Sequence, residues 1–105
     1  MTGGKKVSGA LSAELLERAA GVLKLLAHPQ RLKLVEFLEA QKEAPVHEIM
    51  AHLGLPQAVT SQHLNQMKRV GLVRSSRRGR EVWYGIADPR CLRILNCIRR
   101  AEDKS

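Results

Sequence analysis

The tripeptide Gly54-Leu55-Pro56 constrains the fold of this 105-residue chain more than any other short stretch. Glycine often ends a helix because it accepts the left-handed conformation, and proline cannot continue a helix but can stand just before the next one. Helical apolar spacing runs through residues 46–53 before the tripeptide and resumes at about 57–70 after it. The sequence therefore predicts a short helix, a three-residue turn and a longer second helix.

The rest of the chain divides around this pair of helices. Residues 1–11 are rich in Gly, Lys and Ser and are expected to form a disordered tail, which leaves residues 12–105 as one domain. The expected elements are helices at about 13–27, 30–41, 46–53 and 57–70, strands at 72–74 and 81–86 around a turn at 77–80, and a last helix from Asp88-Pro89 to about 101. We therefore predict a mainly α fold with a small β-hairpin, in the order ααααββα of a winged helix-turn-helix.

The stretch HEIMAH at residues 47–52 nearly matches the H-E-x-x-H signature of zinc proteases, with one residue too many. Five residues of helix separate two side chains by about 140° around the axis, so His47 and His52 cannot both reach one metal ion. No third ligand follows at the spacing that such sites use. We therefore predict no metal site here and expect the two histidines to lie at the surface of a small apolar core.

The basic residues are unevenly distributed along the chain. Eighteen Lys and Arg against ten Asp and Glu give a formal net charge of +8. Between residues 68 and 80 the chain carries six basic residues and no acid. An excess of this kind favours a polyanionic partner, with nucleic acid ahead of an anionic membrane surface. The basic segment covers the end of the second helix of the pair and the predicted hairpin, which are the parts of a winged helix that contact phosphates.

Helical geometry separates two faces of the predicted helix at 57–70. We expect an apolar sector, with Val59, Thr60, His63, Leu64, Met67 and Val70, to face the core, and His63 to be packed and hydrogen-bonded. The opposite face is polar and carries short or amide side chains near the start of the helix, where they could bond base edges. A solvated face and a solvated turn are the ordinary alternatives, but the neighbouring hairpin favours DNA contact. The predicted DNA-binding residues are Gln57, Ala58, Ser61, Gln62, Asn65, Lys68, Arg69, Arg77, Arg78 and Arg80.

Two stretches, residues 25–38 and 53–86, resemble the ArsR/SmtB family of bacterial repressors. The first contains the family's L-x-x-P-x-R-L motif near the start of its second helix. The second contains its L-G-L-S-Q and S-x-H-L patterns, with Pro56 in place of the common Ser, and then its wing pattern R-x-G-R with a following aromatic pair. The likeness covers about residues 20–98. It implies a dimeric winged-helix repressor whose dimer interface is built from the first and last helices.

The same resemblance implies a signal that releases DNA, because members of the family commonly respond to a metal or a thiol-reactive compound. Pro45-Val46-His47 stands where some members carry Cys-x-Cys, so that metal site is missing. Arg90 replaces a histidine of the site on the last helix, and Glu36 replaces the cysteine of a thiol-sensing subgroup. We therefore expect neither a metal site nor a cofactor.

Cys91 and Cys97 both fall in the predicted last helix. Six residues of helix separate them by about 9 Å in rise and 120° in angle, whereas a disulfide needs Cα atoms within about 7 Å. They could be small buried apolar residues, or a thiol sensor that pairs with the other chain of a dimer. Arg90 and the start of the helix favour a thiolate at Cys91, which is the argument for a sensor.

The combined prediction is a homodimeric repressor that binds an inverted-repeat DNA operator and is released by a thiol-reactive or metal(loid) signal. Two cysteines without a disulfide framework indicate a reducing, cytoplasmic location, and the apolar runs are too short to span a membrane. The alternative is a winged-helix module for RNA or protein interaction without a small-molecule signal. No nucleophile–base pair, phosphate loop or pair of acids is legible, so we predict no enzymatic activity.

Overall fold

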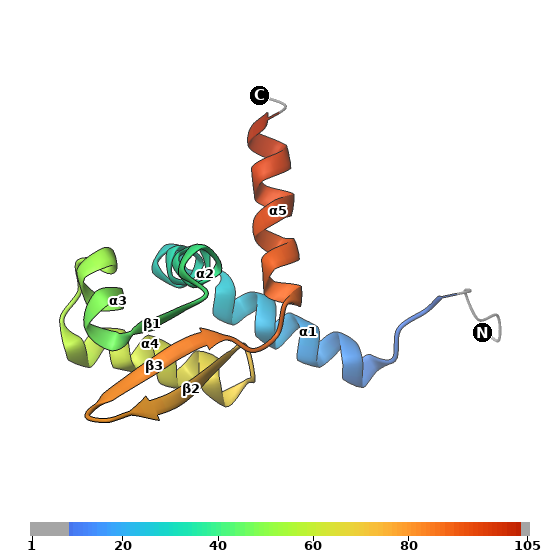
Figure 1. Ribbon diagram of the computed structural model, residues 1–105. Helices are drawn as coiled ribbons and strands as arrows, with labels where there is room; N and C mark the ends of the chain where they lie inside the picture. The colour runs from blue at the N-terminus through green and yellow to red at the C-terminus, as the bar shows by residue number, and fades with distance from the viewer. Residues whose placement is uncertain (1–8, 104–105) are drawn as a thin grey trace, which may run out of the picture.

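The computed structural model describes residues 9–103 as a mainly helical winged helix-turn-helix with a three-stranded antiparallel sheet (Figure 1). Its elements are α1 (Ala13–Leu26), α2 (Pro29–Gln41), β1 (Glu43–Pro45), α3 (Val46–Leu53), α4 (Gln57–Arg69), β2 (Val73–Arg78), β3 (Glu81–Ile86) and α5 (Arg90–Asp103). The predicted fold class is confirmed. The disordered tail predicted at residues 1–11 lies mostly outside the described residues and stays a prediction.

α1 and α2 begin at side chains that satisfy free backbone N–H groups, and α3 ends at a glycine. The Ser12 hydroxyl accepts a hydrogen bond from the Leu15 backbone N–H at 3.1 Å and starts α1. His28 does the same for α2 through Nδ1, which lies 3.2 Å from the Gln30 nitrogen, so α2 begins one residue earlier than predicted. Gly54 has a φ of 69° and ends α3, as its position in the tripeptide predicts.

The sheet contains a strand that the sequence did not predict. β1 is only three residues long and pairs antiparallel with β3, and the strand order is β1-β3-β2. β2 also extends to Arg78, beyond the predicted end at residue 74, and the turn is confined to Gly79-Arg80. The predicted hairpin is therefore one part of a larger wing. A short strand that ends in proline has no alternation of its own to reveal it.

The core lies where α2, α3 and α4 meet the start of the wing. Its most buried side chains include Leu34, Leu38, Ile49, Leu64 and Met67, each 0–1% exposed. Burying one such side chain stabilises the fold by about 1.5–3 kcal/mol. Two members of the sector predicted to face the core are wrongly placed, because Val59 is 37% exposed and Val70 is 47% exposed.

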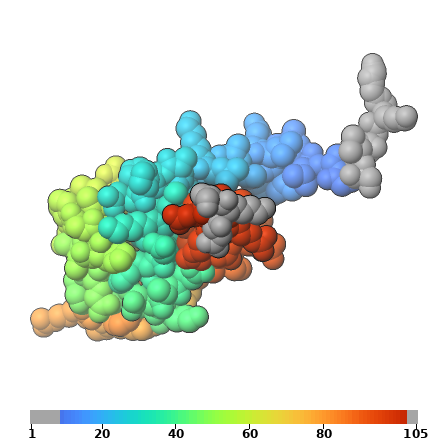
Figure 2. Space-filling model, turned by 90° about the horizontal axis from the view of Figure 1, so that it is seen from above, coloured from blue at the N-terminus to red at the C-terminus, as the bar shows by residue number. Residues whose placement is uncertain are grey.

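Two helices leave the body of the domain and expose apolar side chains. α1 projects to one side and α5 rises away from the wing (Figures 1 and 2). Leu16 and Leu23 on α1 and Ile98 on α5 are about half exposed. Because water-exposed leucine and isoleucine in such numbers favour association, these helices are suited to contact another chain. No helix in the described part is long and apolar enough to cross a membrane.

Candidate nucleic-acid interface

α4 is fixed to the rest of the domain by one arginine of α2. Arg31 Nε donates to His63 Nδ1 at 3.0 Å, and Arg31 Nη2 donates to Gln66 Oε1 at 2.6 Å. The third contact runs from Arg31 Nη1 to the Leu25 carbonyl oxygen at 3.1 Å, at the end of α1. The guanidinium group therefore joins α1, α2 and α4 through hydrogen bonds of fixed direction. Neither this role of Arg31 nor that of Gln66 was predicted from the sequence.

His63 is the packed, hydrogen-bonded histidine that the helical pattern predicts. It is 8% exposed, and the His28 ring packs edge-on against it with 4.8 Å between ring centres. Burial lowers the pKa of His63 from its ordinary value, and the nearby charges of Arg31 and His28 lower it further. The neutral ring is the form that can accept the hydrogen bond from Arg31.

The opposite face of α4 is polar and has no partners. Gln57, Ala58, Gln62 and Asn65 are exposed, and Ser61 is half-buried. Within residues 9–103 none of these side chains makes a hydrogen bond. The N-terminal half of α4 thus presents amide and hydroxyl groups without protein partners on one face. Hydrogen bonds from Arg31 hold the helix in place through His63 and Gln66.

At the C-terminal end of α4, the two predicted phosphate contacts differ in their surroundings. Lys68 Nζ donates to the Ser75 hydroxyl at 2.6 Å and so joins α4 to β2. Arg69 is exposed and has no ion pair within the described residues. Since serine is neutral, this contact pairs Lys68 with no opposite charge.

The wing arginines lie on different faces of the sheet. Successive strand residues point to opposite sides, so Arg77 shares a side of β2 with Ser75, which bonds α4, whereas Arg74 and Arg78 point the other way. Arg77 and Arg80 are exposed and have no acidic partner in the part of the chain that the structure describes. Arg78 therefore lies on the opposite side of the sheet from Arg77, although the sequence predicts that Arg77, Arg78 and Arg80 all bind DNA.

On that other side, four residues form what we call the outer-face cluster: Glu43, Arg74, Arg78 and Trp83. Glu43 accepts from Arg74 Nη1 at 2.8 Å and from Arg78 Nη2 at 2.6 Å, and the Arg78 guanidinium lies 4.7 Å from the centre of the Trp83 ring. The hydrogen bonds from Arg74 and Arg78 lower the pKa of Glu43, which therefore stays ionised at neutral pH. This cluster could not be predicted from the sequence, because Glu43 lies 31 and 35 positions before its two partners.

The two histidines of the HEIMAH stretch have separate partners. His47 Nδ1 lies 3.1 Å from Glu81 Oε2 on the wing, and the His52 ring stacks on Phe37 with 4.3 Å between centres. Among residues 9–103 there is no group of three or more His, Cys, Asp and Glu side chains that could hold a metal ion.

The two cysteines of α5 differ in exposure. Cys91 is 2% exposed and its thiol donates to the Asp88 carbonyl oxygen at 3.0 Å, whereas Cys97 is exposed beside Arg93 and Arg100. Burial, followed by the charge of Asp88, raises the pKa of Cys91. The expectation that Arg90 and the helix start would favour a thiolate at Cys91 is therefore wrong, because the thiol is buried and Arg90 is paired with Asp88 at 2.8 Å.

A short helix, a three-residue turn, a longer helix with a free polar face and a basic wing define a winged helix-turn-helix transcription regulator. The comparisons with known proteins agree. A profile described as "Bacterial regulatory protein, arsR family" matches residues 28–75. The transcriptional repressor PagR of Bacillus anthracis is 40% identical over 87 residues, which cover 80% of this chain and 87% of PagR. The chain belongs to the ArsR family of DNA-binding transcriptional repressors.

Further relatives and solved structures support the same assignment. The repressor SmtB of Mycobacterium tuberculosis is 39% identical over 82 residues, which cover 78% of this chain and 60% of SmtB. The crystal structure of PagR superimposes with a TM-score of 0.74 at 37% identity, over 83% of this chain and 99% of that one. A homodimeric winged helix-turn-helix DNA-binding domain from Mycobacterium bovis does so with a TM-score of 0.77 at 31% identity, over 93% and 92%. The family consists of regulators, so the predicted absence of enzymatic activity is confirmed.

Proposed function

We propose that this repressor binds an inverted-repeat operator as a homodimer, and that the free face of α4 reads the bases. The observation that supports this most directly is the row of side chains without partners on α4, directly beside exposed cations. Gln62 and Asn65 carry amides that can bond adenine in two places, and Ser61 is short enough to allow close approach. Arg69, Arg77 and Arg80, together with Lys68, would contact phosphates on either side of the groove.

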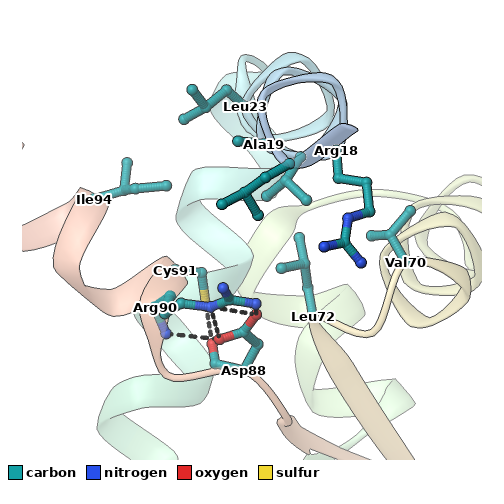
Figure 3. A pocket seen from close by; sticks show the side chains of 11 residues that line it. Arg18, Ala19, Leu23, Val70, Leu72, Asp88, Arg90, Cys91 and Ile94 are labelled. Carbon is teal, nitrogen blue, oxygen red and sulfur yellow. Dashed lines mark hydrogen bonds and ion pairs between the residues drawn. The ribbon is translucent and has the colours of Figure 1, made fainter. Parts of the chain in front are cut away.

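The second chain would cover the apolar surface of α1 and α5. Figure 3 shows Ala19 and Leu23 of α1 facing Cys91 and Ile94 of α5 across a hollow of about 440 Å³, which also exposes Val70. A second copy related by a two-fold axis would fill this hollow with its own apolar helices. The homodimer described for the Mycobacterium bovis domain supports this arrangement. Two-fold symmetry would present two α4 helices to two half-sites, which makes the operator an inverted repeat.

The signal that releases DNA would act at α5. Cys97 is the accessible thiol, and Arg93 and Arg100 lie beside it. We propose that a thiol-reactive or metal(loid) compound joins a cysteine of one subunit to a cysteine of the other. The two cysteines of one helix are too far apart to form a disulfide with each other. The alternative is a repressor that responds to no small-molecule signal.

Selection of DNA from random sequence by the purified protein tests the proposal. We expect the selected sequences to share an inverted repeat with half-site centres about 34–36 Å apart. Recovery of a single half-site would contradict the dimer. Failure to enrich any common sequence would contradict the reading of bases by α4.

A further inference from the structure

The outer-face cluster is positioned by the register of the three strands. Glu43 on β1 and Arg74 on β2 are both paired with Gly85 on the central strand β3. All three residues therefore lie in one row across the sheet, on the same face. An arginine side chain is long enough to reach across the central strand, provided that nothing stands between it and the acid.

Gly85 keeps that path open. A Cβ atom on Gly85 would lie 2.8 Å from Arg74 Nη2 and 2.9 Å from Arg74 Cζ, and all three of the nearest atoms that it would meet belong to Arg74. The guanidinium of Arg74 thus lies flat over the glycine backbone and reaches Glu43 at 2.8 Å. A larger residue at this position would force the Arg74 guanidinium to shift from its place over the glycine.

Arg78 is held from two sides in the same cluster. Its guanidinium lies over the Trp83 ring and donates to the second oxygen of Glu43 at 2.6 Å. Both arginines are still about half exposed, so phosphates could reach them if the carboxylate were absent. Glu43 therefore occupies both arginines of this face and offsets one of their two charges, while the cations on the other face and at the tip stay free.

We propose that Glu43 determines the DNA selectivity of the wing by keeping Arg74 and Arg78 away from the phosphates of non-operator DNA. This inference rests on the proposed function, in which α4 reads the operator. On the operator, base contacts by α4 fix one orientation of the protein on the duplex, and the free cations beside α4 supply the phosphate contacts. Random DNA has no base contacts to lose, so it would gain from any extra cation that it could reach. An acid that occupies two arginines removes this gain and widens the difference between the two kinds of DNA.

The test compares three full-length variants in titrations of operator and random duplexes over a range of salt concentrations. Glu43→Gln frees both arginines. Glu81→Gln is the matched control, because it removes the same charge from the wing but its partner is His47 rather than an arginine. Gly85→Ala leaves the net charge unchanged and displaces only Arg74. Thermal unfolding of each variant verifies that the domain is folded.

We expect Glu43→Gln to bind random DNA about 3–10-fold more tightly at moderate salt, and to steepen the salt slope by about 0.9 for each arginine that gains a phosphate. Operator affinity should rise less, so the ratio of the two affinities should fall. Gly85→Ala should show a smaller change in the same direction, and Glu81→Gln should stay close to the parent protein.

Two results would overturn the inference. If Glu43→Gln and Glu81→Gln behave alike, only net charge matters and Glu43 has no special role. If Glu43→Gln weakens both kinds of DNA, the carboxylate prepares Arg78 for direct DNA contact rather than withholding it. In both cases the parent protein still prefers its operator, so the proposed function is unaffected. A parent protein that binds no duplex would contradict both proposals.

Discussion

At the scale of single residues, the contact between Arg31 and His63 joins α4, the helix that we propose reads DNA, to α2 behind it. The imidazole accepts the arginine hydrogen bond through Nδ1, which is possible only in the neutral form. Protonation would place a second positive charge directly against the guanidinium. The pH at which this contact is lost can therefore be measured as a change in stability.

We expect the free energy of unfolding to fall as the pH drops below about 6.5, the ordinary pKa of histidine. The pKa of His63 is lowered in the folded state, so its stabilising contribution is complete above the unfolded-state value and is lost as the pH falls through the folded-state value. Urea unfolding at a series of pH values measures this. His63→Gln retains an acceptor for Arg31 and should lose part of the pH dependence.

The control for that measurement is His52→Gln, which replaces an exposed histidine that stacks on Phe37. It should retain the pH dependence of the parent protein. If His63→Gln and the parent protein lose stability in parallel on acidification, another group is responsible.

Several residue contacts could not be predicted from the sequence because they depend on the tertiary structure. Glu43 meets its arginines only because β1 and β2 pair with the same residue of β3, and that register is a property of the whole sheet. Arg31 could be assigned to a family motif, but the motif does not say which atoms it bonds. His63, by contrast, was predictable because a helix has a fixed angle per residue and the core side of α4 could be worked out.

At the scale of elements, the helix-turn-helix pair was the most predictable part of the chain. α3 has the predicted bounds, since glycine and proline punctuate the chain through local backbone geometry alone. β1 was missed because a three-residue strand is defined by its partner rather than by its own sequence. Val59 and Val70 were misplaced because a helical pattern identifies an apolar side chain but not whether the same chain covers it.

α4 and the wing should make separable contributions to DNA binding. We expect Gln62→Ala to cost about 1–3 kcal/mol on the selected operator and much less on random DNA, because an amide–base contact is lost. Arg77→Ala should weaken both kinds of DNA to the same degree and reduce the salt slope by about 1. Titration of both duplexes with both variants measures the two effects.

Gln41→Ala serves as the control, because Gln41 is an exposed glutamine at the end of α2, outside the helix-turn-helix pair. It should change neither affinity. Equal weakening of operator and random DNA by Gln62→Ala would mean that α4 is not the element that reads sequence.

At the scale of the whole molecule, the free cations of the two subunits add together. Lys68, Arg69, Arg77 and Arg80 offer about four phosphate contacts per subunit, or about eight in a dimer. We expect the logarithm of the binding constant to fall with the logarithm of salt concentration with a slope of about −7. Fluorescence anisotropy at salt concentrations between about 50 and 200 mM measures that slope. A nearly flat response would contradict the proposed interface.

In the proposed function, the cysteines act only in the dimer. Mild oxidation by diamide would remove two protons and two electrons from a pair of thiols and form one interchain S–S bond. We expect a crosslinked dimer on a non-reducing gel, with weaker operator binding, and we expect Cys97→Ser to abolish both effects because Cys97 is the exposed thiol. By linkage, bound operator should slow the crosslinking in return.

Cys91→Ser is the comparison for that experiment, since the buried thiol should contribute little to the first crosslink. If the parent protein forms no interchain species and keeps its operator affinity after oxidation, both cysteines serve only in packing. The repressor would then respond to another signal or to none.

The three hydrogen bonds of Arg31 have a consequence for how relatives of this protein can diverge. They attach α4 to the last turn of α1, so in the proposed dimer we expect a tilt of α1 to be passed to α4. Changes on the exposed surfaces of α1 and α5 could then give the repressor a new inducer without altering the side chains that face DNA. Changes on the outer surface of α4 could give it a new operator without altering the inducer. If Arg31 is retained, the choice of inducer and the choice of operator could therefore evolve separately.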